Sequence, residues 1–373
     1  MATEKPEWKI ILEGLRASLL KNYLPFAFFV ALLVALAWPL PGEKVLEPEV
    51  AGVHVITFVC ICIVFFISGL TLRTDELKKS LTRRTIFGTV FGFLSIVALT
   101  PLLAYGVRDL PFSPREFATG LAIFCMMPTT LGVGVSLVTS AKGNVALAIF
   151  LTVGTNILGV VLIPLWLRAV LTGAKHGVEN LNISYLDLFL KLLLSFTVPT
   201  VVGKALREYC PGVLPFVRAH KTALSLFSNT ILAVIIWQTI SSGREILVNA
   251  KFGDVLLVIV ATTLIHFIYL LFNALVLYGM RVPPFEGVSV LIMASQKSAP
   301  VAVSVITFIT SDAATQGILA VPCVIGQLMQ IFVGQPLANY LAGRIKRWDT
   351  EQAEIQRAQA GEAKPEMKAE DVP

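Results

Sequence analysis

Long apolar runs recur along almost the whole chain, and each has about the 17–25 residues that one helix needs to cross a membrane. Of the 373 residues, 55% are hydrophobic and only 14% are charged, whereas a soluble chain carries roughly 25% charged residues. Lipid offers no partner for backbone N–H and C=O groups, so each run must form a helix. The sequence therefore predicts an all-α, multi-pass membrane protein and excludes a soluble domain.

The apolar runs predict about ten transmembrane helices, which the loop 169–184 divides into two sets of five. Because five is odd, the second set would cross the membrane upside down relative to the first, an arrangement typical of secondary transporters. The predicted spans are 24–40, 53–72, 85–106, 115–140 and 143–168 in the first repeat, and 185–206, 222–241, 254–279, 286–310 and 314–342 in the second. An N-terminal segment (1–23) and a polar C-terminal tail (343–373), whose start prolongs the last helix, complete the chain.

Lysine and arginine are unevenly distributed over the loops of this topology. Most of them lie on the side that holds both termini, above all in the loop 73–84. Basic loops stay on the cytoplasmic side of a membrane. We therefore expect both termini in the cytoplasm or its topological equivalent.

Two of the predicted spans are interrupted by polar segments that contain proline. The fourth contains Met127-Pro128-Thr129-Thr130 and the ninth contains Gln296-Lys297-Ser298-Ala299-Pro300. The segments that follow, 133–139 and 301–307, are identical at four of seven positions. Proline removes a backbone donor, and free polar backbone at this depth survives only in protein or beside water. Related breaks in corresponding helices indicate a binding site near the middle of the membrane.

Lys297 is the least expected residue of these breaks. An ammonium group near the middle of a bilayer costs about 2.5–3.5 kcal/mol on insertion scales, and such residues usually mark a functional site. None of the 24 aspartate and glutamate residues falls in the middle of a predicted span. Lys297 is therefore predicted to lack a carboxylate partner.

Several motifs together resemble the bile acid:sodium symporter superfamily, in particular its SBF-like branch and the plant plastid sodium/metabolite cotransporters. They are Ser68-Gly69-Leu70 with Arg73, the run 115–121, Met127–Thr130 with the run 141–148, the run 198–204, and Gln296-Lys297-Ser298. The resemblance implies ten helices in a panel domain (helices 1, 2, 6 and 7) and a core domain (3–5 and 8–10). It also implies that the broken helices 4 and 9 cross in the core, with a small organic anion bound near the crossing and sodium just behind it.

The sequence departs from the sodium-coupled members of that family at the positions that ligate sodium. Ile292 and Lys297 stand where those members carry a glutamate and an asparagine in the ninth helix. Val133 and Gly134 stand where they carry a serine and an asparagine, and the glutamine of the third helix falls near Ile96. Much of the expected sodium cage is therefore missing.

Three functional interpretations of Lys297 remain open from the sequence. Its ammonium could be the counter-charge of an anionic substrate, which half-helix N-termini would also favour. It could instead occupy the place of the missing sodium ion, or it could load and unload a proton and so make transport proton-coupled. The structural alternative is an ammonium that snorkels to an interface or is capped by carbonyl groups.

The candidate substrate or ion site combines the two breaks with polar residues of neighbouring helices. Asn156 is included because an unpaired buried amide is costly; Thr152, one turn away, and His266, in the eighth helix, are weaker candidates. The predicted site residues are Thr129, Thr130, Asn156, Gln296, Lys297 and Ser298, with Thr152 and His266 less certain. No residue spacing indicates a bound metal or organic cofactor, so sodium or a proton is the only coupling ion considered.

The function predicted from these observations is secondary active transport of a small organic anion by alternating access, coupled to sodium, coupled to protons or uncoupled. The alternative is a regulatory membrane protein that affects ion homeostasis or trafficking without moving a substrate. No nucleophile–base or paired-carboxylate arrangement indicates an enzyme, and the expected partners are the substrate and the lipid bilayer rather than nucleic acid. The location would be a plasma or inner membrane, or the plastid envelope if the source is a plant or alga.

Overall fold

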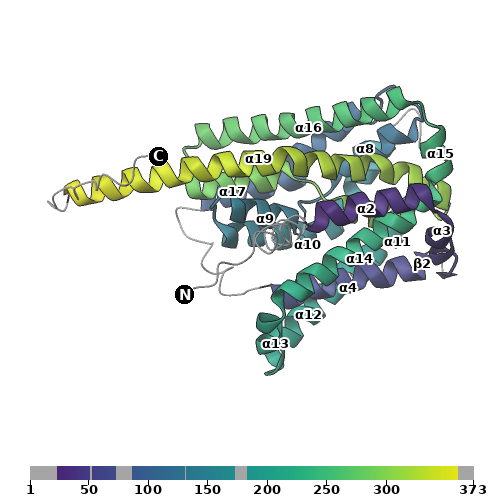
Figure 1. Cartoon of the computed structure of the whole chain (residues 1–373), viewed down its shortest axis with the longest axis horizontal. Coiled ribbons are helices and arrows are strands. Elements are labelled where there is room, and N and C mark those ends of the chain that lie inside the picture. Colours follow the sequence, from purple (N-terminus) through teal and green to yellow (C-terminus); the bar gives the residue numbers. More distant parts are fainter. Residues whose placement is uncertain (1–22, 51–52, 73–85, 131, 173–182, 360–373) are drawn as a thin grey trace, which may run out of the picture.

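The computed structural model describes residues 23–50, 53–72, 86–130, 132–172 and 183–359 (Figure 1). This part of the chain is almost entirely helical, apart from a two-stranded antiparallel ribbon of β1 (Glu49–Val50) and β2 (Val53–His54). The N-terminal segment, the basic loop 73–84 and most of the loop 169–184 lie outside the described residues. The orientation of the termini therefore remains a prediction.

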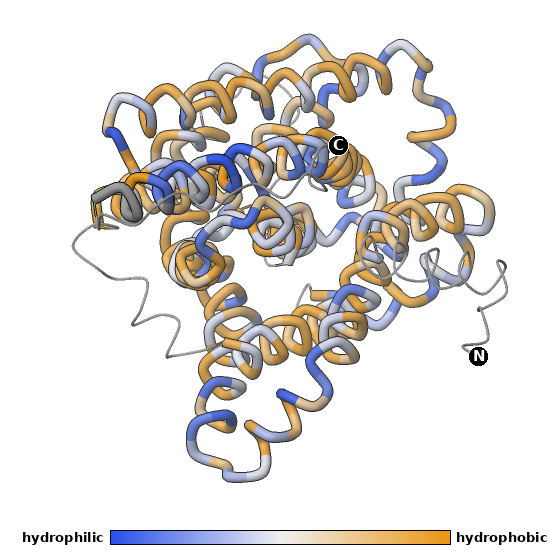
Figure 2. The backbone as a smooth tube through the Cα atoms, turned by 60° about the vertical axis from the view of Figure 1, so that its left-hand side comes forward, coloured by the Kyte–Doolittle hydropathy of each residue, from blue (hydrophilic) through white to orange (hydrophobic). Residues whose placement is uncertain are grey.

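The described residues contain seven helical segments that are long and apolar enough to cross a membrane. They become eight if the bent pair α2 (Tyr23–Ala37) and α3 (Leu40–Leu46) counts as one span. Figure 2 shows hydrophobic residues along most of the helical turns. The prediction of a multi-pass helical membrane protein is confirmed, while the count of ten spans and the repeat boundaries stay predictions.

The first predicted span is shorter than expected from its apolar run. The chain bends by 100° between α2 and α3, so the helix stops at Ala37 instead of continuing to residue 40. Pro39 causes the stop, because the residue before a proline is pushed out of the helical region.

One set of helices, which we call the first helix group, consists of α2, α4 (Val55–Thr71), α11 (Tyr185–Leu192), α12 (Val198–Tyr209) and α14 (Lys221–Ser242). In it α2 packs against α14, and α4 packs against both α12 and α14 (Figure 1). Glycines set the close approach of α4 and α12, since a methyl group on Gly69 would collide with the Thr200 carbonyl and one on Gly203 with the Phe66 carbonyl. Small residues at such contacts allow helices to associate without a hydrophobic driving force.

The second helix group holds the predicted breaks. Its members are α6 (Ile86–Leu94), η1 (Ser95–Leu99), η2 (Thr100–Leu103), α7 (Ala104–Val107), α8 (Glu116–Met126), α9 (Val133–Ser140), α10 (Val145–Leu171), α16 (Phe252–Gly279), α17 (Pro284–Ser295), α18 (Ala299–Ile309) and α19 (Ala313–Gln359). In the most apolar 18-residue stretch of the span formed by α17 and α18, 94% of the residues are buried, against 28% in the corresponding stretch of α16. The interrupted span is therefore central, and α16 presents an apolar face to lipid.

Each expected break is present as a gap between two helices. Between α8 and α9 the chain leaves the helical conformation at Met127 and re-enters it at Val133. Between α17 and α18 it does so at Gln296 and Ala299. Two short helices placed end to end therefore occupy each of these positions.

A further irregularity lies in the third predicted span. Residues Ser95–Leu99 of η1 form a π-helical turn that precedes Pro101. Proline removes the donor for the carbonyl four residues earlier, and the Trp166 indole donates to that carbonyl, on Val97, at 2.8 Å instead. Such turns are frequent at functional sites because they release backbone carbonyls.

Helices α8 and α19 lie on either side of the crossing and approach each other closely at a glycine. A methyl group on Gly120 of α8 would meet the Leu319 carbonyl of α19, so these two helices touch at the backbone. Helix α19 then runs on to Gln359. The start of the polar tail at 343 therefore belongs to the last helix.

Candidate functional site at the helix crossing

The two breaks meet directly in the interior of the second helix group. The Ser298 amide donates to the carbonyl oxygen of Pro128 at 3.1 Å, and the Thr129 hydroxyl donates to the carbonyl oxygen of Met293 at 2.7 Å. Each break thus uses polar groups of the other to satisfy backbone that its own helix has released. The pairing joins segments that lie more than 160 residues apart in the chain.

Lys297 is buried at this crossing with an exposed fraction of 0%. Its Nζ atom donates to the carbonyl oxygen of Met127 at 2.9 Å and to that of Ile96 at 3.2 Å. The same atom lies over the Tyr269 ring, 5.6 Å from the ring centroid, within the range of a cation–π contact. Two of the three donor hydrogens of the ammonium are therefore used by carbonyl oxygens, and an aromatic face lies beside it.

The carbonyl groups that receive Lys297 come from irregular backbone. Met127 is the residue that ends α8, where unpaired carbonyls and the helix dipole favour a positive charge. Ile96 lies in the π-helical turn before Pro101. The side chain therefore joins the crossing to the irregular turn of the third predicted span.

No carboxylate compensates this charge among the described residues. Lys297 is the one aspartate, glutamate, lysine or arginine in that part of the chain that is buried. Removing an ion from water costs several kcal/mol even after relaxation. The charge is stabilised by carbonyl dipoles and a ring face.

Two glutamines of α19 complete the ninth-helix break. The Gln330 side-chain oxygen accepts from the Lys297 amide at 2.9 Å, and the Gln327 side-chain oxygen accepts from the Ala299 amide at 3.2 Å. Gln296 in turn donates to the Gln330 carbonyl oxygen at 3.3 Å. Ser298 caps α18 by accepting from the Val301 amide at 3.4 Å, a common role for serine before a helix.

Asn156 ties the other break to α10. Its Nδ2 atom donates to the carbonyl oxygens of Thr129, at 3.1 Å, and Thr152, at 2.7 Å. Thr152 itself donates only within its own helix, to the Ala148 carbonyl oxygen at 2.8 Å. The structure thus brings Asn156 to the crossing and leaves the Thr152 hydroxyl outside it.

The remaining candidates lie at the edges of the crossing. Thr130 is buried with its methyl group against Gly134. His266 of α16 pairs its Nδ1 with the Ser295 carbonyl oxygen at 3.0 Å; because a carbonyl oxygen only accepts, Nδ1 carries the proton. His266 therefore supports the end of α17 and does not contact Lys297.

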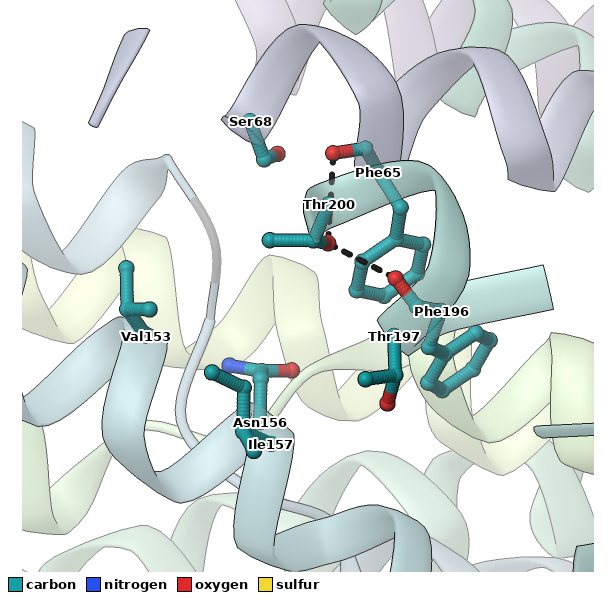
Figure 3. A pocket seen from close by; sticks show the side chains of 8 residues that line it. All are labelled: Phe65, Ser68, Val153, Asn156, Ile157, Phe196, Thr197 and Thr200. Atoms are coloured by element: carbon teal, nitrogen blue, oxygen red, sulfur yellow. Dashed lines mark hydrogen bonds between the residues drawn. The ribbon is translucent and has the colours of Figure 1, made fainter. Parts of the chain in front are cut away.

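A small cavity lies where α10 faces the first helix group (Figure 3). Its volume of about 20 Å³ is enough for a water molecule. It is lined by Phe65, Ser68, Val153, Asn156, Ile157, Phe196, Thr197 and Thr200. Asn156 projects toward it from α10 (Figure 3) and has an Oδ1 atom without a hydrogen-bond partner. The cavity joins the crossing to the boundary between the two helix groups.

In the described part of the chain, no group of three histidine, cysteine, aspartate or glutamate residues is placed so that it could hold a metal ion.

The groups around Lys297 that the sequence did not identify are the Ile96 and Met127 carbonyls and the Tyr269 ring. Pro101 was the sequence signal for the first of these, since it disrupts the helix around Ile96.

The sequence also matches known proteins over most of its length. The profile of the SBF-like CPA transporter family matches residues 22–343. The chain is 34% identical over 329 residues to the probable sodium/metabolite cotransporter BASS4, chloroplastic, of Oryza sativa. This alignment covers 86% of this chain and 75% of the rice protein. The chain is 32% identical over 336 residues to the protein of the same name in Arabidopsis thaliana, covering 88% and 74%. It is 24% identical over 355 residues to the sodium/bile acid cotransporter 7-B of Xenopus laevis, covering 90% and 94%.

Proposed function

The chain belongs to the SBF-like CPA transporter family, and from this we propose that it is a secondary active transporter of a small organic anion. Its relatives are named as cotransporters of metabolites or bile acids, and members of the family are transporters rather than enzymes. Multi-pass helices of the required hydropathy agree with this class.

The observation that carries the proposal is the buried crossing of two helix breaks beside a cavity between two helix groups. Interrupted helices at membrane depth are tolerated where they line a site. The first helix group would act as a panel and the second as a core that rocks against it, so that the cavity opens to each side in turn. On this proposal the ten spans form two inverted repeats, 24–168 and 185–342, with both termini on the cytoplasmic-equivalent side.

An anionic substrate is supported by the charge of the crossing. Lys297 has no buried carboxylate beside it in the described residues, and a low-dielectric site focuses the field of such a charge. The substrate would bind at the cavity, where Asn156 Oδ1 would accept from a hydroxyl group of the substrate and the hydroxyls of Ser68, Thr197 and Thr200 line the wall. Thr129, Thr130, Gln296, Lys297 and Ser298 would form the wall behind it.

The coupling ion is the second part of the proposal. Sodium is the ion in the names of the relatives. In this chain the Lys297 ammonium donates to the carbonyl oxygens at the crossing, so they are not available to a sodium ion. Uptake would therefore be coupled to a sodium ion that binds outside the crossing, coupled to protons, or uncoupled. The membrane would be a plastid envelope, since relatives in two plants are named chloroplastic, or a plasma or inner membrane.

Uptake by the purified protein in proteoliposomes tests this function. Short-chain carboxylates and bile salts are offered as labelled anions under a sodium gradient, a proton gradient and neither. Saturable uptake of one class that requires the protein supports transport. A well-folded protein that moves none of them under any gradient would favour the regulatory alternative.

A matched pair of variants links the uptake to the cavity. Asn156→Leu removes the free oxygen and the tie to Thr129, so uptake is expected to fall at least tenfold. Leu158→Ala alters a neighbouring side chain that is 44% exposed and is expected to leave uptake unchanged. Equal effects of both variants would contradict the placement of the substrate.

A further inference from the structure

We propose that the Lys297 ammonium is a tethered cation that permanently fills a monovalent-cation site at the crossing, and that removing it re-creates a site for a free cation. The part of this inference that concerns coupling rests on the proposed transport function. The part that concerns cation binding rests on the crossing alone.

The first step is that the crossing has the ligands of a cation site. The carbonyl oxygens of Ile96 and Met127 converge on one point, which Nζ occupies at 3.2 Å and 2.9 Å. Carbonyl oxygens released from regular helix replace the hydration shell of monovalent ions in membrane proteins. The Tyr269 face, with its centroid 5.6 Å from Nζ, adds a further surface that favours positive charge.

The second step is that this point requires a positive charge. Both residues are buried, and a buried carbonyl that loses its partner is costly. The Ile96 oxygen has a second donor, the Thr100 hydroxyl, but at 3.5 Å. Met127 ends α8, so the negative end of that helix dipole is directed at the same place. An empty crossing would leave these negative dipoles facing one another.

The third step is that the ammonium is enclosed by protein groups. Nζ donates to two carbonyl oxygens and lies over a ring face, and the side chain is 0% exposed. An anion could not reach Nζ without displacing one of these groups. Lys297 therefore acts as the cation of the site and not as the hydrogen-bonding partner of the substrate.

The fourth step concerns what would bind in place of the ammonium. The asparagine side chain in Lys297→Asn is shorter, so an ion would take the place of Nζ, with the two carbonyl oxygens and the new side-chain oxygen as its ligands. Hard monovalent cations prefer such oxygen ligands.

Thermal unfolding of the purified full-length protein tests cation binding without requiring transport. The wild type, Lys297→Asn and Lys297→Met are titrated with sodium, potassium and choline chloride at constant ionic strength. We expect the wild type to respond equally to all three salts. Lys297→Asn is expected to start at a lower Tm and to gain several degrees with sodium or potassium but not with choline, since a ligand that binds only the folded state raises Tm.

Two controls separate the site from general effects of the substitution. Lys297→Met offers no oxygen and is expected to show a much smaller cation response than Lys297→Asn. Lys142→Asn makes the same change at an exposed lysine whose φ of 56° suits asparagine, and it is expected to behave as the wild type. Failure of Lys297→Asn to respond, or a sodium-specific response of the wild type, would overturn the inference.

The cation site can still be tested if Lys297→Asn does not fold in choline buffer. Membranes are then extracted in sodium, potassium or ammonium chloride, and recovery of monodisperse Lys297→Asn protein in any of them, with none in choline, supports the site. Failure in all of these salts overturns it, because a free cation then cannot replace the tethered one.

Uptake adds the consequence for coupling. Wild-type uptake is expected to be the same when sodium is replaced by choline, whereas Lys297→Asn uptake becomes at least tenfold dependent on sodium or potassium. A selective Tm gain in Lys297→Asn together with no uptake in any variant would uphold the site and reject the transport function. Proton-driven wild-type uptake, lost in Lys297→Asn without any cation response, would assign a proton to Lys297 and overturn the inference.

Discussion

The Nζ atom of Lys297 lies 2.9 Å from the carbonyl oxygen of Met127, a residue 170 positions earlier in the chain. This hydrogen bond joins the two interrupted helices and brings a buried positive charge to the end of α8. The crossing is therefore held by a charge-assisted contact to backbone, a stronger kind than a neutral hydrogen bond. Its removal is expected to lower stability and to change uptake.

Replacing Lys297 with methionine is expected to abolish gradient-driven uptake while the protein still folds. Methionine has a similar length, but it takes away the ammonium from which the carbonyl oxygens of Ile96 and Met127 accept. Uptake into proteoliposomes, compared at equal amounts of monodisperse protein, measures the effect. Unchanged uptake would contradict a role of Lys297 in transport.

Replacing Gln330 with leucine is expected to destabilise the protein by about 1–3 kcal/mol, the cost of a buried group that loses its partner. The lost acceptor serves the Lys297 amide at 2.9 Å. Thermal unfolding in detergent is the measurement, with Gln335→Leu as the control because Gln335 pairs with Asn339 in an exposed contact. Similar shifts for the two variants would show that the break does not depend on Gln330.

Asn156 and Thr152 are expected to differ although they lie one turn apart. Asn156→Ala cuts the link from α10 to the Thr129 carbonyl, so it should lower both Tm and uptake. Thr152→Val removes a hydroxyl that bonds only within its helix, so it should change Tm by less than Asn156→Ala and leave uptake intact. Thermal unfolding and uptake are measured for both variants. A larger loss of uptake in Thr152→Val than in Asn156→Ala would show instead that Thr152 belongs to the site.

Asp312, in the turn between α18 and α19, is expected to make stability depend on pH in the acid range. The Thr315 hydroxyl and amide donate to its carboxylate, and this hydrogen bonding lowers the pKa of Asp312 from its ordinary value of 3.8. The folded-state pKa lies below that of the unfolded chain, so the stabilisation is present above the unfolded value and is lost as pH falls through the folded value. Asp312→Asn should therefore flatten the decline of Tm on acidification. Equal declines in both proteins would contradict this role.

The membrane class and the approximate spans could be predicted from the sequence because they follow from local hydropathy. Lipid allows one solution for each apolar run, and a proline within it marks an interruption whatever the rest of the chain does. The breaks at Met127–Thr130 and Gln296–Pro300 were identified in this way, and both are present. The bend after Ala37 was missed because hydropathy alone does not register the effect of Pro39.

The partners of Lys297 could not be predicted, because they are backbone atoms of Ile96 and Met127 and leave no pattern of residue types. The sequence left three functional interpretations of the lysine open. The contacts of Nζ favour the one in which the ammonium stands in for a bound cation. The same holds for Gln330, whose role depends on the packing of α19 against the ninth-helix break.

The sequence by itself determined that this chain spans a membrane, where its helices are interrupted and that one interruption carries an unpaired charge. Those properties depend only on the residues of each segment and on the lipid or water that surrounds it. Tertiary structure alone decided which carbonyl groups meet that charge, which polar side chains remain inside their own helices and where a cavity is left between the helix groups. These depend on distances between segments remote in sequence, which only the packing of the whole chain fixes.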